Sequence, residues 1–423
     1  MMRKIEYRNI GEEVYEGELE NGLRIRVIPK SGFSSCYAVF GTNYGGAMRR
    51  FEIDGEIIDT PAGVAHFLEH KMFDMPNGDN ALGILSQNGA DPNAFTSSGV
   101  TFYYFKCTEN FEENLKMLLR FVSTPYFTPE TVEKEQGIIG QEILMCEDNP
   151  GNKIYYNLLN ILYDHHPIKD KVAGSIESIA QITDKTLYDC HKVFYAPSNM
   201  VLCVEGDVDP EKVFEIADSI LPKEIRSIPH ADFGEKESLL PVSKKITDEM
   251  AVSAPLFCIG AKLNADAPIK ERLIANLALK LLVGPSSPFY SRLYSDGLIT
   301  HDFDCETDYS ANVGYVILSG ESSCPEKIFE ELINECTRIA NNGFKDDYFS
   351  RALKSTQGFQ LRALEEFDEI CVSTAFALLE GYSYFDTFNL IGTITKEECQ
   401  NWIKENLASD RLAISIINPI RTN

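Results

Sequence analysis

The feature that most constrains the fold of this chain is an internal repeat at about half its length. Residues 111–115 (FEENL) are echoed 218 residues later by residues 329–333 (FEELI). Phe127, which precedes an acidic helix start, is echoed 217 residues later by Phe344. A repeat at a fixed interval indicates a duplicated structural unit, although two amphipathic helices of similar composition would also produce it. In a chain of 423 residues, the repeat predicts two sister units.

Each unit is predicted to combine strands with helices. Segments rich in β-branched and aromatic residues, mostly bounded by Gly, Asn or Pro, are typical of strands, and apolar residues at helical spacing indicate helices. The run 358–377, which mixes acids with Phe and Leu, predicts a packed helix. The fold class expected is α+β, with two homologous units that each cover an antiparallel-rich sheet with helices. The predicted strands of the first half are residues 23–28, 36–44, 100–106 and 200–204, and its predicted helices are residues 111–122, 129–145 and 213–220.

A stretch rich in proline and charge separates the two predicted units. Residues 221–250 contain Pro222, Pro229 and Pro241 among charged residues, which is typical of a linker. The expected organisation is an N-terminal unit at residues 1–225, a linker at 226–248 and a C-terminal unit at 249–423.

Composition excludes several classes of partner. The chain has 39 Lys and Arg against 64 Asp and Glu, a formal charge of -25, which disfavours binding to nucleic-acid phosphates or an anionic membrane. We therefore expect no nucleic-acid and no membrane partner. The first residues lack the apolar run of a secretory signal. The 11 cysteines are scattered, odd in number and form no CxxC pair, which favours a cytoplasmic location.

The residues that carry chemistry lie in the segment 63–73 (GVAHFLEHKMF). On a helix, His66 and His70 project from one face and can bind one metal ion, with Glu69 beside that ion. This order, H-x-x-E-H, is the inverted form of a zinc-peptidase motif. Zn²⁺ is the expected metal because two imidazoles and a carboxylate leave a fourth position for water. A solvated helix face is the alternative, but the apolar flanks place this helix in a core, where unpartnered histidines are costly.

A third ligand is expected from the predicted helix 129–145, where the candidates are Glu130, Glu133, Glu135 and Glu142. Glu135 and Glu142 are seven residues apart, two turns along one helix face, so both can face one site. Cys146 and Glu147 lie outside this pattern.

Residues 132–143 (VEKEQGIIGQEI) resemble the downstream glutamate helix of the pitrilysin/insulinase family of inverted zinc metallopeptidases. The chain looks like a bacterial member similar to the mitochondrial processing peptidases, which belong to that family. Residues 89–96 and 101–104 are similar to the family's Asn-Ala-aromatic-Thr edge strand. A plain sheet strand with aromatic core residues is the other interpretation of that segment.

The resemblance implies a role for each residue of the site. It makes His66, His70 and Glu142 the zinc ligands, although the 72 residues between His70 and Glu142 are slightly fewer than in the family. Glu69 is implied as the general base, which takes a proton from water and delivers it to the leaving amine. Glu135 is implied as a second catalytic residue, which does not bind zinc itself but orients one of the zinc ligands.

The resemblance also implies where substrate binds. An extended peptide would add to the edge strand at Asn93, Ala94 and Phe95. Residues 288–300 resemble a segment where active members carry an Arg and, seven residues later, a Tyr that hold substrate. Here the Arg position is Tyr294 and the Tyr position falls at a residue that is neither Arg nor Tyr, Thr300 or His301. Arg292 is the remaining candidate for this role.

The expected function is that of a zinc metalloendopeptidase that hydrolyses extended peptides in a closed chamber. Some family members divide the metal site and the Arg/Tyr pair between two chains of this length. We therefore expect this chain to be the metal-bearing half of a clamshell, paired with a homologous partner chain as a heterodimer or with itself as a homodimer. The alternatives are a non-catalytic structural or assembly subunit of the same fold, and a deacylase with the same metal.

Overall fold

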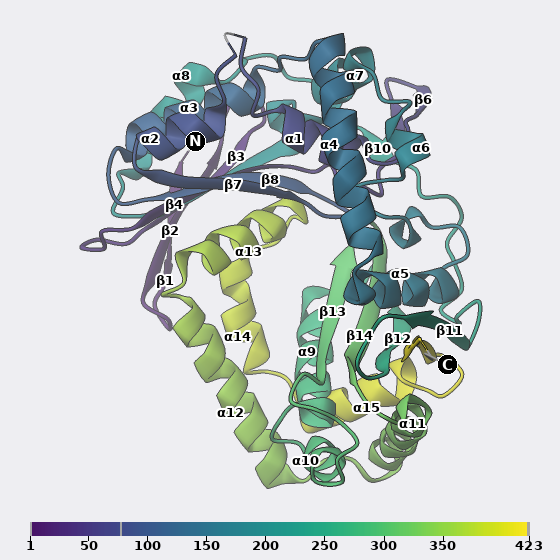
Figure 1. The fold of residues 1–423 in the computed structure, drawn as a ribbon. Helices are drawn as coiled ribbons and strands as arrows, with labels where there is room; N and C mark the ends of the chain where they lie inside the picture. Colours follow the sequence, from purple (N-terminus) through teal and green to yellow (C-terminus); the bar gives the residue numbers. More distant parts are fainter. Residues whose placement is uncertain (1, 77, 421–423) are drawn as a thin grey trace. The chain divides into compact units, whose positions relative to one another are not determined.

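The computed structural model describes residues 2–76 and 78–420 (Figure 1). Its contacts divide the chain into two compact units, each built from three segments. Unit 1 comprises Met1–Ile143, Asp170–Phe233 and Leu361–Phe385, and unit 2 comprises Leu144–Lys169, Gly234–Gln360 and Asp386–Asn423.

This division differs from the linear one expected from the sequence, residues 1–225, 226–248 and 249–423. A segment of each half packs with the sheet of the other half, so the units are not continuous in sequence. The chain passes from unit 1 to unit 2 three times, and one of these passages, between Phe233 and Gly234, lies inside the predicted linker. That linker is mostly irregular, but it contains the short strand β10 (His230–Ala231), which pairs with β5 (Arg50–Ile53). Its last residues, 245–248, already belong to a strand of unit 2, β11 (Lys245–Met250).

Unit 1 contains a seven-stranded sheet in the order β1-β2-β3-β9-β4-β8-β7. All of its neighbouring strands are antiparallel except β3 and β9. β7 lies at one edge of the sheet. A second sheet, in the order β10-β5-β6, completes the strands of this unit. The bounds are β1 Arg3–Tyr7, β2 Glu12–Glu18, β3 Arg24–Pro29, β4 Cys36–Thr42, β6 Glu56–Asp59, β7 Ala90–Thr96, β8 Thr101–Cys107 and β9 Met200–Gly206.

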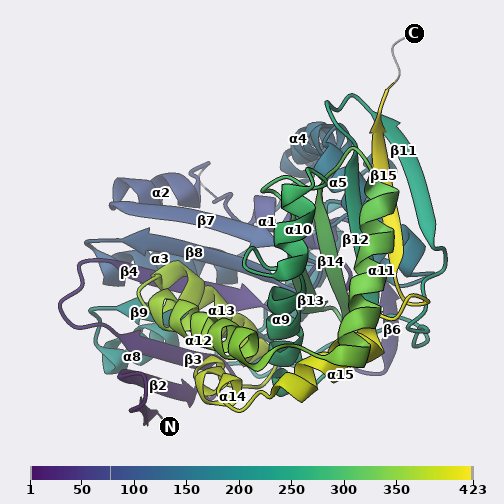
Figure 2. The ribbon, with the colours of Figure 1, turned by 90° about the horizontal axis from the view of Figure 1, so that it is seen from below.

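Helices cover both faces of the large sheet of unit 1 (Figures 1 and 2). Inward residues of one face, such as Phe40, Tyr103 and Leu202, form the main core with the helices that include α1, α3 and α7. Residues of the opposite face, such as Val39 and Phe102, form a second, smaller core, and the one helix of the described chain that contributes buried residues to it is α13. The helices of unit 1 are α1 Val64–Lys71, α2 Ala81–Gln87, α3 Phe111–Ser123, α4 Pro129–Glu147 (to Ile143), α6 Ile176–Ile179, α7 Asp184–Phe194, η2 Pro197–Asn199, α8 Pro210–Ile220, α13 Phe367–Leu379 and η3 Tyr384–Asp386 (to Phe385).

Unit 2 contains a five-stranded sheet in the order β11-β15-β12-β14-β13. Its first pair is parallel and the other three are antiparallel. The same sequence of pairings is present in β3-β9-β4-β8-β7 of unit 1, which confirms two homologous units with antiparallel-rich sheets. The bounds are β11 Lys245–Met250, β12 Leu256–Leu263, β13 Asp304–Ser310, β14 Val313–Glu321 and β15 Ala413–Pro419.

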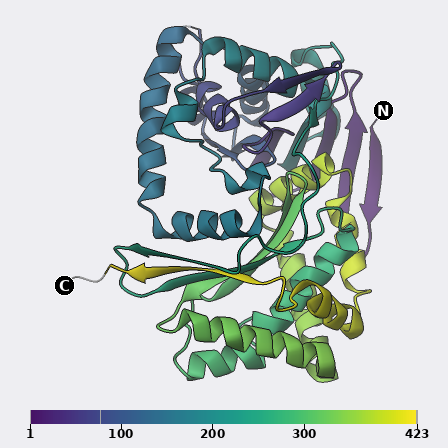
Figure 3. The same cartoon turned by 90° about the vertical axis from the view of Figure 1, so that its right-hand side faces the viewer.

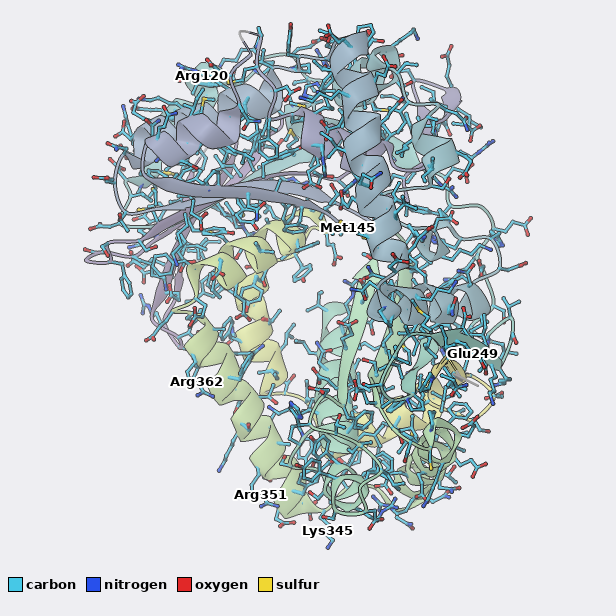
Figure 4. All side chains as sticks on the ribbon, in the orientation of Figure 1. Arg120, Met145, Glu249, Lys345, Arg351 and Arg362 are labelled. Carbon is cyan, nitrogen blue, oxygen red and sulfur yellow. The ribbon has the colours of Figure 1, made fainter. Side chains whose placement is uncertain are left out.

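The sheet of unit 2 also has helices on both faces. In Figure 3, α5 lies on one side of this sheet and the green helices lie on the other. Arg351 and Arg362 mark the long helix α12 in Figure 4. The remaining elements are α5 Pro150–Leu162, η1 Pro167–Lys169, α9 Ile269–Val283, α10 Pro288–Ser295, α11 Pro325–Asn342, α12 Asp346–Ala363, α14 Thr387–Ile391 and α15 Lys396–Asn406.

The exchanged segments carry equivalent helices. α5 comes from the first half of the chain and packs on the sheet of unit 2, and α13 comes from the second half and packs on the sheet of unit 1. The single packed helix predicted at residues 358–377 is wrong, because the run breaks between the end of α12 at Ala363 and the start of α13 at Phe367. No helix in the described part of the chain is long and apolar enough to cross a membrane.

Candidate metal centre

The helix that carries the H-x-x-E-H motif, α1, begins at a glycine that cannot be replaced without strain. Gly63 adopts φ 95°, and a Cβ added there would lie 2.6 Å from the carbonyl oxygen of Ala173. Val64, Ala65, Phe67 and Leu68 of the helix are buried. The apolar residues therefore fix which face of α1 packs on the core, and His66, Glu69 and His70 are left half-buried beside it.

Three side chains converge on one point between α1 and α4. Nε2 of His66 and Oε1 of Glu142 are 3.5 Å apart, and Nε2 of His70 and Oε2 of Glu142 are also 3.5 Å apart. One donor atom from each residue can be chosen so that all lie within 4.8 Å of one another. Among the described residues, this is the one cluster of three or more such side chains that could hold a metal ion.

The geometry of this cluster suits zinc. Bonds of about 2.0–2.1 Å at tetrahedral angles place neighbouring ligand atoms about 3.3 Å apart, close to the two 3.5 Å separations. A distance of 3.5 Å is long for a direct hydrogen bond between the same atoms. Two imidazoles and one carboxylate are also a donor set of catalytic zinc sites.

Glu135 contacts the outer nitrogen of one histidine. Its Oε1 lies 3.0 Å from Nδ1 of His70, so Nε2 is the nitrogen of His70 that faces Glu142. Burial acts to lower the pKa of His70, but the hydrogen bond with Glu135 and the charges of Glu135, Glu142 and Glu69 outweigh it and raise the pKa. Contact with His66 lowers the pKa of the Glu142 carboxyl. Nδ1 of His66 is buried without a hydrogen-bond partner in the part of the chain described.

A buried lysine helps to hold α1 against α4. Lys71 is 1% exposed, forms an ion pair with Asp74, and donates a hydrogen bond of 3.4 Å to the carbonyl oxygen of Thr131. Thr131 lies in the first turn of α4, one turn before Glu135. Nothing in the sequence marks Lys71 as part of the site, since a lysine one residue after the motif would ordinarily be a surface residue.

Glu69 is held by a threonine. Oγ1 of Thr96, the last residue of β7, donates a hydrogen bond of 2.5 Å to Oε2 of Glu69. This contact was also missed from the sequence, although Thr96 belongs to the edge-strand motif. The period-two alternation of a strand could have placed its side chain on the same face as that of Ala94.

The predicted substrate-binding residues Asn93, Ala94 and Phe95 lie on β7, the edge strand of the sheet. The amide of Ala94 donates to Oδ1 of Asn93 at 2.9 Å. The ring of Phe95 packs against Phe102 and Phe376 on the face covered by α13.

Arg292 belongs to α10 in unit 2, whereas β7 belongs to unit 1. It forms an ion pair of 2.9 Å with Glu331 and lies over the ring of Phe289. Its substrate-binding role stays a prediction. Tyr294 is 55% exposed on the same helix.

Of the other glutamates considered on α4, Glu130 and Glu133 are exposed and are not in the metal cluster. Cys146 and Glu147 are not in it either. They lie in the last turn of α4, next to Met145, which Figure 4 labels.

Comparison with known proteins places this geometry in a peptidase family. Residues 55–175 match the family model described as insulinase, peptidase family M16, and residues 181–356 match the model described as the peptidase M16 inactive domain. The first match contains every residue of the metal cluster.

Relatives of similar length exist. The chain is 37% identical to an uncharacterized zinc protease, YmfH, of Bacillus subtilis over 99% of this chain and 100% of that protein. It is 30% identical to an M16-like peptidase from Alicyclobacillus acidocaldarius of known crystal structure, with a TM-score of 0.91, covering 97% of this chain and 99% of the other. The crystal structure of pitrilysin shares the fold, with a TM-score of 0.78 and 13% identity, over 99% of this chain but 46% of the pitrilysin chain.

Proposed function

The chain belongs to peptidase family M16, the insulinase family, and on that premise we propose that it is a zinc-dependent endopeptidase that hydrolyses extended peptides. The observation that carries the proposal is the convergence of His66, His70 and Glu142 at distances that suit a tetrahedral ion. The relatives named as zinc proteases support zinc as the metal.

A zinc ion held by His66, His70 and Glu142 would supply a Lewis acid that polarises the scissile carbonyl and makes water more acidic. Glu69 would accept a proton from the attacking water and pass it to the nitrogen of the leaving amine as the C–N bond breaks. Glu135 would keep the ring of His70 oriented through its contact with Nδ1.

The edge strand β7 supports the proposal that the substrate is extended. Ser97 donates to Val100 at 2.8 Å beside the pair Thr96–Thr101, so the odd-numbered residues of β7 are the ones that bond to β8. Main-chain groups alternate direction along a strand, and those of Pro92, Ala94 and Thr96 therefore face the free edge. A peptide could pair there as an added strand, replacing Oδ1 of Asn93 as the acceptor for the amide of Ala94.

We further propose that this chain works as the metal-bearing part of a two-chain enzyme that encloses its substrate in a chamber. It spans only about half of the pitrilysin chain, and the segment expected to carry an Arg/Tyr pair has Tyr294 and Thr300 at or near those positions. The partner would be a homologous chain, either a different one or a second copy. Peptide cleavage by a purified monomer at the rate of the complex would reject this part of the proposal.

We propose a cytoplasmic location from the cysteines of the chain. All 11 cysteines are free in the structure, and most are buried as small core residues. A free thiol persists best in a reducing compartment.

The proposal is tested by peptide cleavage with the zinc-loaded wild type and Glu69→Gln, each alone and with a homologous chain from the same genome. Glu133→Gln is the matched control, because Glu133 is an exposed glutamate on α4 outside the cluster. We expect cleavage by the wild type and the control, with a loss of at least about 100-fold in Glu69→Gln. Zinc binding without cleavage under every condition would favour the alternative, a non-catalytic structural subunit.

A further inference from the structure

The base of the proposed reaction has a single anchor. Among the described residues, the hydrogen bond from Thr96 is the one direct hydrogen bond or ion pair made by the Glu69 carboxylate, and it engages Oε2. By contrast, the carboxylates of Glu135 and Glu142 each contact a histidine. A glutamate side chain has three rotatable bonds, so its carboxylate position depends on whatever holds its end.

Thr96 is itself well placed to act as that anchor. Its neighbour across the strands is Thr101, which is fully buried. The two hydroxyl oxygens are 3.3 Å apart, and that of Thr101 donates to the carbonyl oxygen of Tyr44 at 2.9 Å. With the proton of Thr101 directed to Tyr44, and with an ionised carboxylate unable to donate, the proton of Thr96 points to Glu69.

The turn that follows Thr96 is fixed by a neighbouring loop. The amides of Gly46 and Ala47 donate to the carbonyl oxygens of Ser97 and Ser98 at 2.9 and 3.0 Å. Gly45 passes so close that an added Cβ would lie 2.5 Å from the backbone of Gly99. Branching at Cβ also restricts the side-chain torsion of Thr96. Both the backbone next to Thr96 and the side-chain torsion of Thr96 are therefore restricted, and together they fix the position of its hydroxyl.

We infer that Thr96 is a positioning residue that aims the Glu69 carboxylate, and that β7 thereby fixes the base relative to the bound peptide. This inference rests on the proposed function. The side chain of Thr96 reaches Glu69 while its main-chain groups face the free edge of β7, where the peptide is proposed to pair. One residue therefore sets the distance between the docked main chain and the group that activates water.

Thr96→Val tests the side-chain role of Thr96 separately from its main-chain role at the edge of β7. The substitution removes the hydroxyl but keeps the branched shape and the main chain. We expect kcat to fall about 10- to 100-fold, the effect of one hydrogen bond to a charged group. KM should stay within about threefold, and zinc content and Tm should match the wild type. Thr96→Ser should recover most of the lost kcat because it restores the hydroxyl.

The control is Thr42→Val. Thr42 is buried, whereas Thr96 is half-buried, and it pairs with Thr101 on the other side; its hydroxyl donates to the carbonyl oxygen of Phe194. This variant should lose stability without the selective loss of kcat. An equal fall of kcat in Thr42→Val, a rise in KM alone in Thr96→Val, or no recovery in Thr96→Ser would overturn the inference.

Crystal structures of the zinc-loaded proteins provide a second measurement that needs no activity. In Thr96→Val the Glu69 carboxylate should rotate or become disordered, and in Thr96→Ser it should keep its wild-type position. An unmoved carboxylate in Thr96→Val would refute the positioning role even if the enzyme proved inactive. If instead the carboxylate moves as expected but the wild type cleaves no peptide, the proposed function fails and the positioning role stands.

Discussion

Replacement of Glu135 by glutamine should weaken zinc binding without removing a ligand. Glu135 accepts from Nδ1 of His70 at 3.0 Å and is 15% exposed at its side chain, so water only partly screens its charge. Glutamine keeps an oxygen at this position but loses the negative charge that stabilises the imidazole as a donor. The hydrogen bond with a charged partner contributes about 1.5–3 kcal/mol, which corresponds to a fall in zinc affinity of about 10- to 100-fold.

The affinity can be measured by competition with a chromophoric zinc chelator at pH 7.5. The matched control is Glu133→Gln, which removes one negative charge from the same helix without touching the cluster. The wild type and the control should agree within about twofold. A Glu135→Gln protein that binds zinc as tightly as the control would refute the role given to Glu135, and a control as weak as Glu135→Gln would assign the effect to general charge.

Three further predictions concern the scaffold and the metal. Gly63→Ala should lower the free energy of unfolding by at least about 2 kcal/mol, because it combines a positive φ with contact with the Ala173 carbonyl oxygen. The control Gly32→Ala, at φ 83° in open space, should lower it less. Equal losses of the two variants in urea denaturation would contradict the steric argument. Burial lowers the pKa of His191 to about 4, and its ring bonds to the Val122 carbonyl oxygen. The unfolded chain, with a pKa near 6.5, binds this proton first, so stability present above pH 6.5 should fall by about 3 kcal/mol as the pH drops to 4; a His191→Gln protein with the same pH slope of unfolding would contradict this. Removal of zinc by a chelator should lower Tm, and its return should restore it, since an ion that binds only the folded protein stabilises it; an unchanged Tm would show that the ion does not bind the fold.

The sequence predicted the parts of the site that depend on local periodicity. Four-residue spacing places His66 and His70 on one face of α1, and seven-residue spacing does the same for Glu135 and Glu142 on α4. The structure brings His66, His70 and Glu142 together and places Glu135 on the outer nitrogen of His70. Spacing along a helix paired Glu135 with Glu142, but only the family resemblance assigned Glu142 to the ion and Glu135 to the outer position.

The features that the sequence did not predict depend on pairing between distant segments. Nothing in the apolar pattern of residues 150–162 or 367–379 says which sheet each helix covers, so the exchange of α5 and α13 was not foreseen. The same limit applies to Thr96, whose partner Glu69 lies 27 residues away on another element. A continuous run of apolar and acidic residues likewise concealed the break between α12 and α13.

The central claim is that His66, His70 and Glu142 bind one zinc ion, and zinc K-edge X-ray absorption of the loaded protein tests it most directly. Metal analysis should give one zinc per chain, and the spectrum should show two imidazole nitrogens at about 2.0 Å and oxygen ligands in the remaining positions. Glu142→Gln should lower the affinity while both imidazoles remain bound. A spectrum dominated by sulfur ligands, or one with fewer than two imidazoles in the wild type, would contradict the claim.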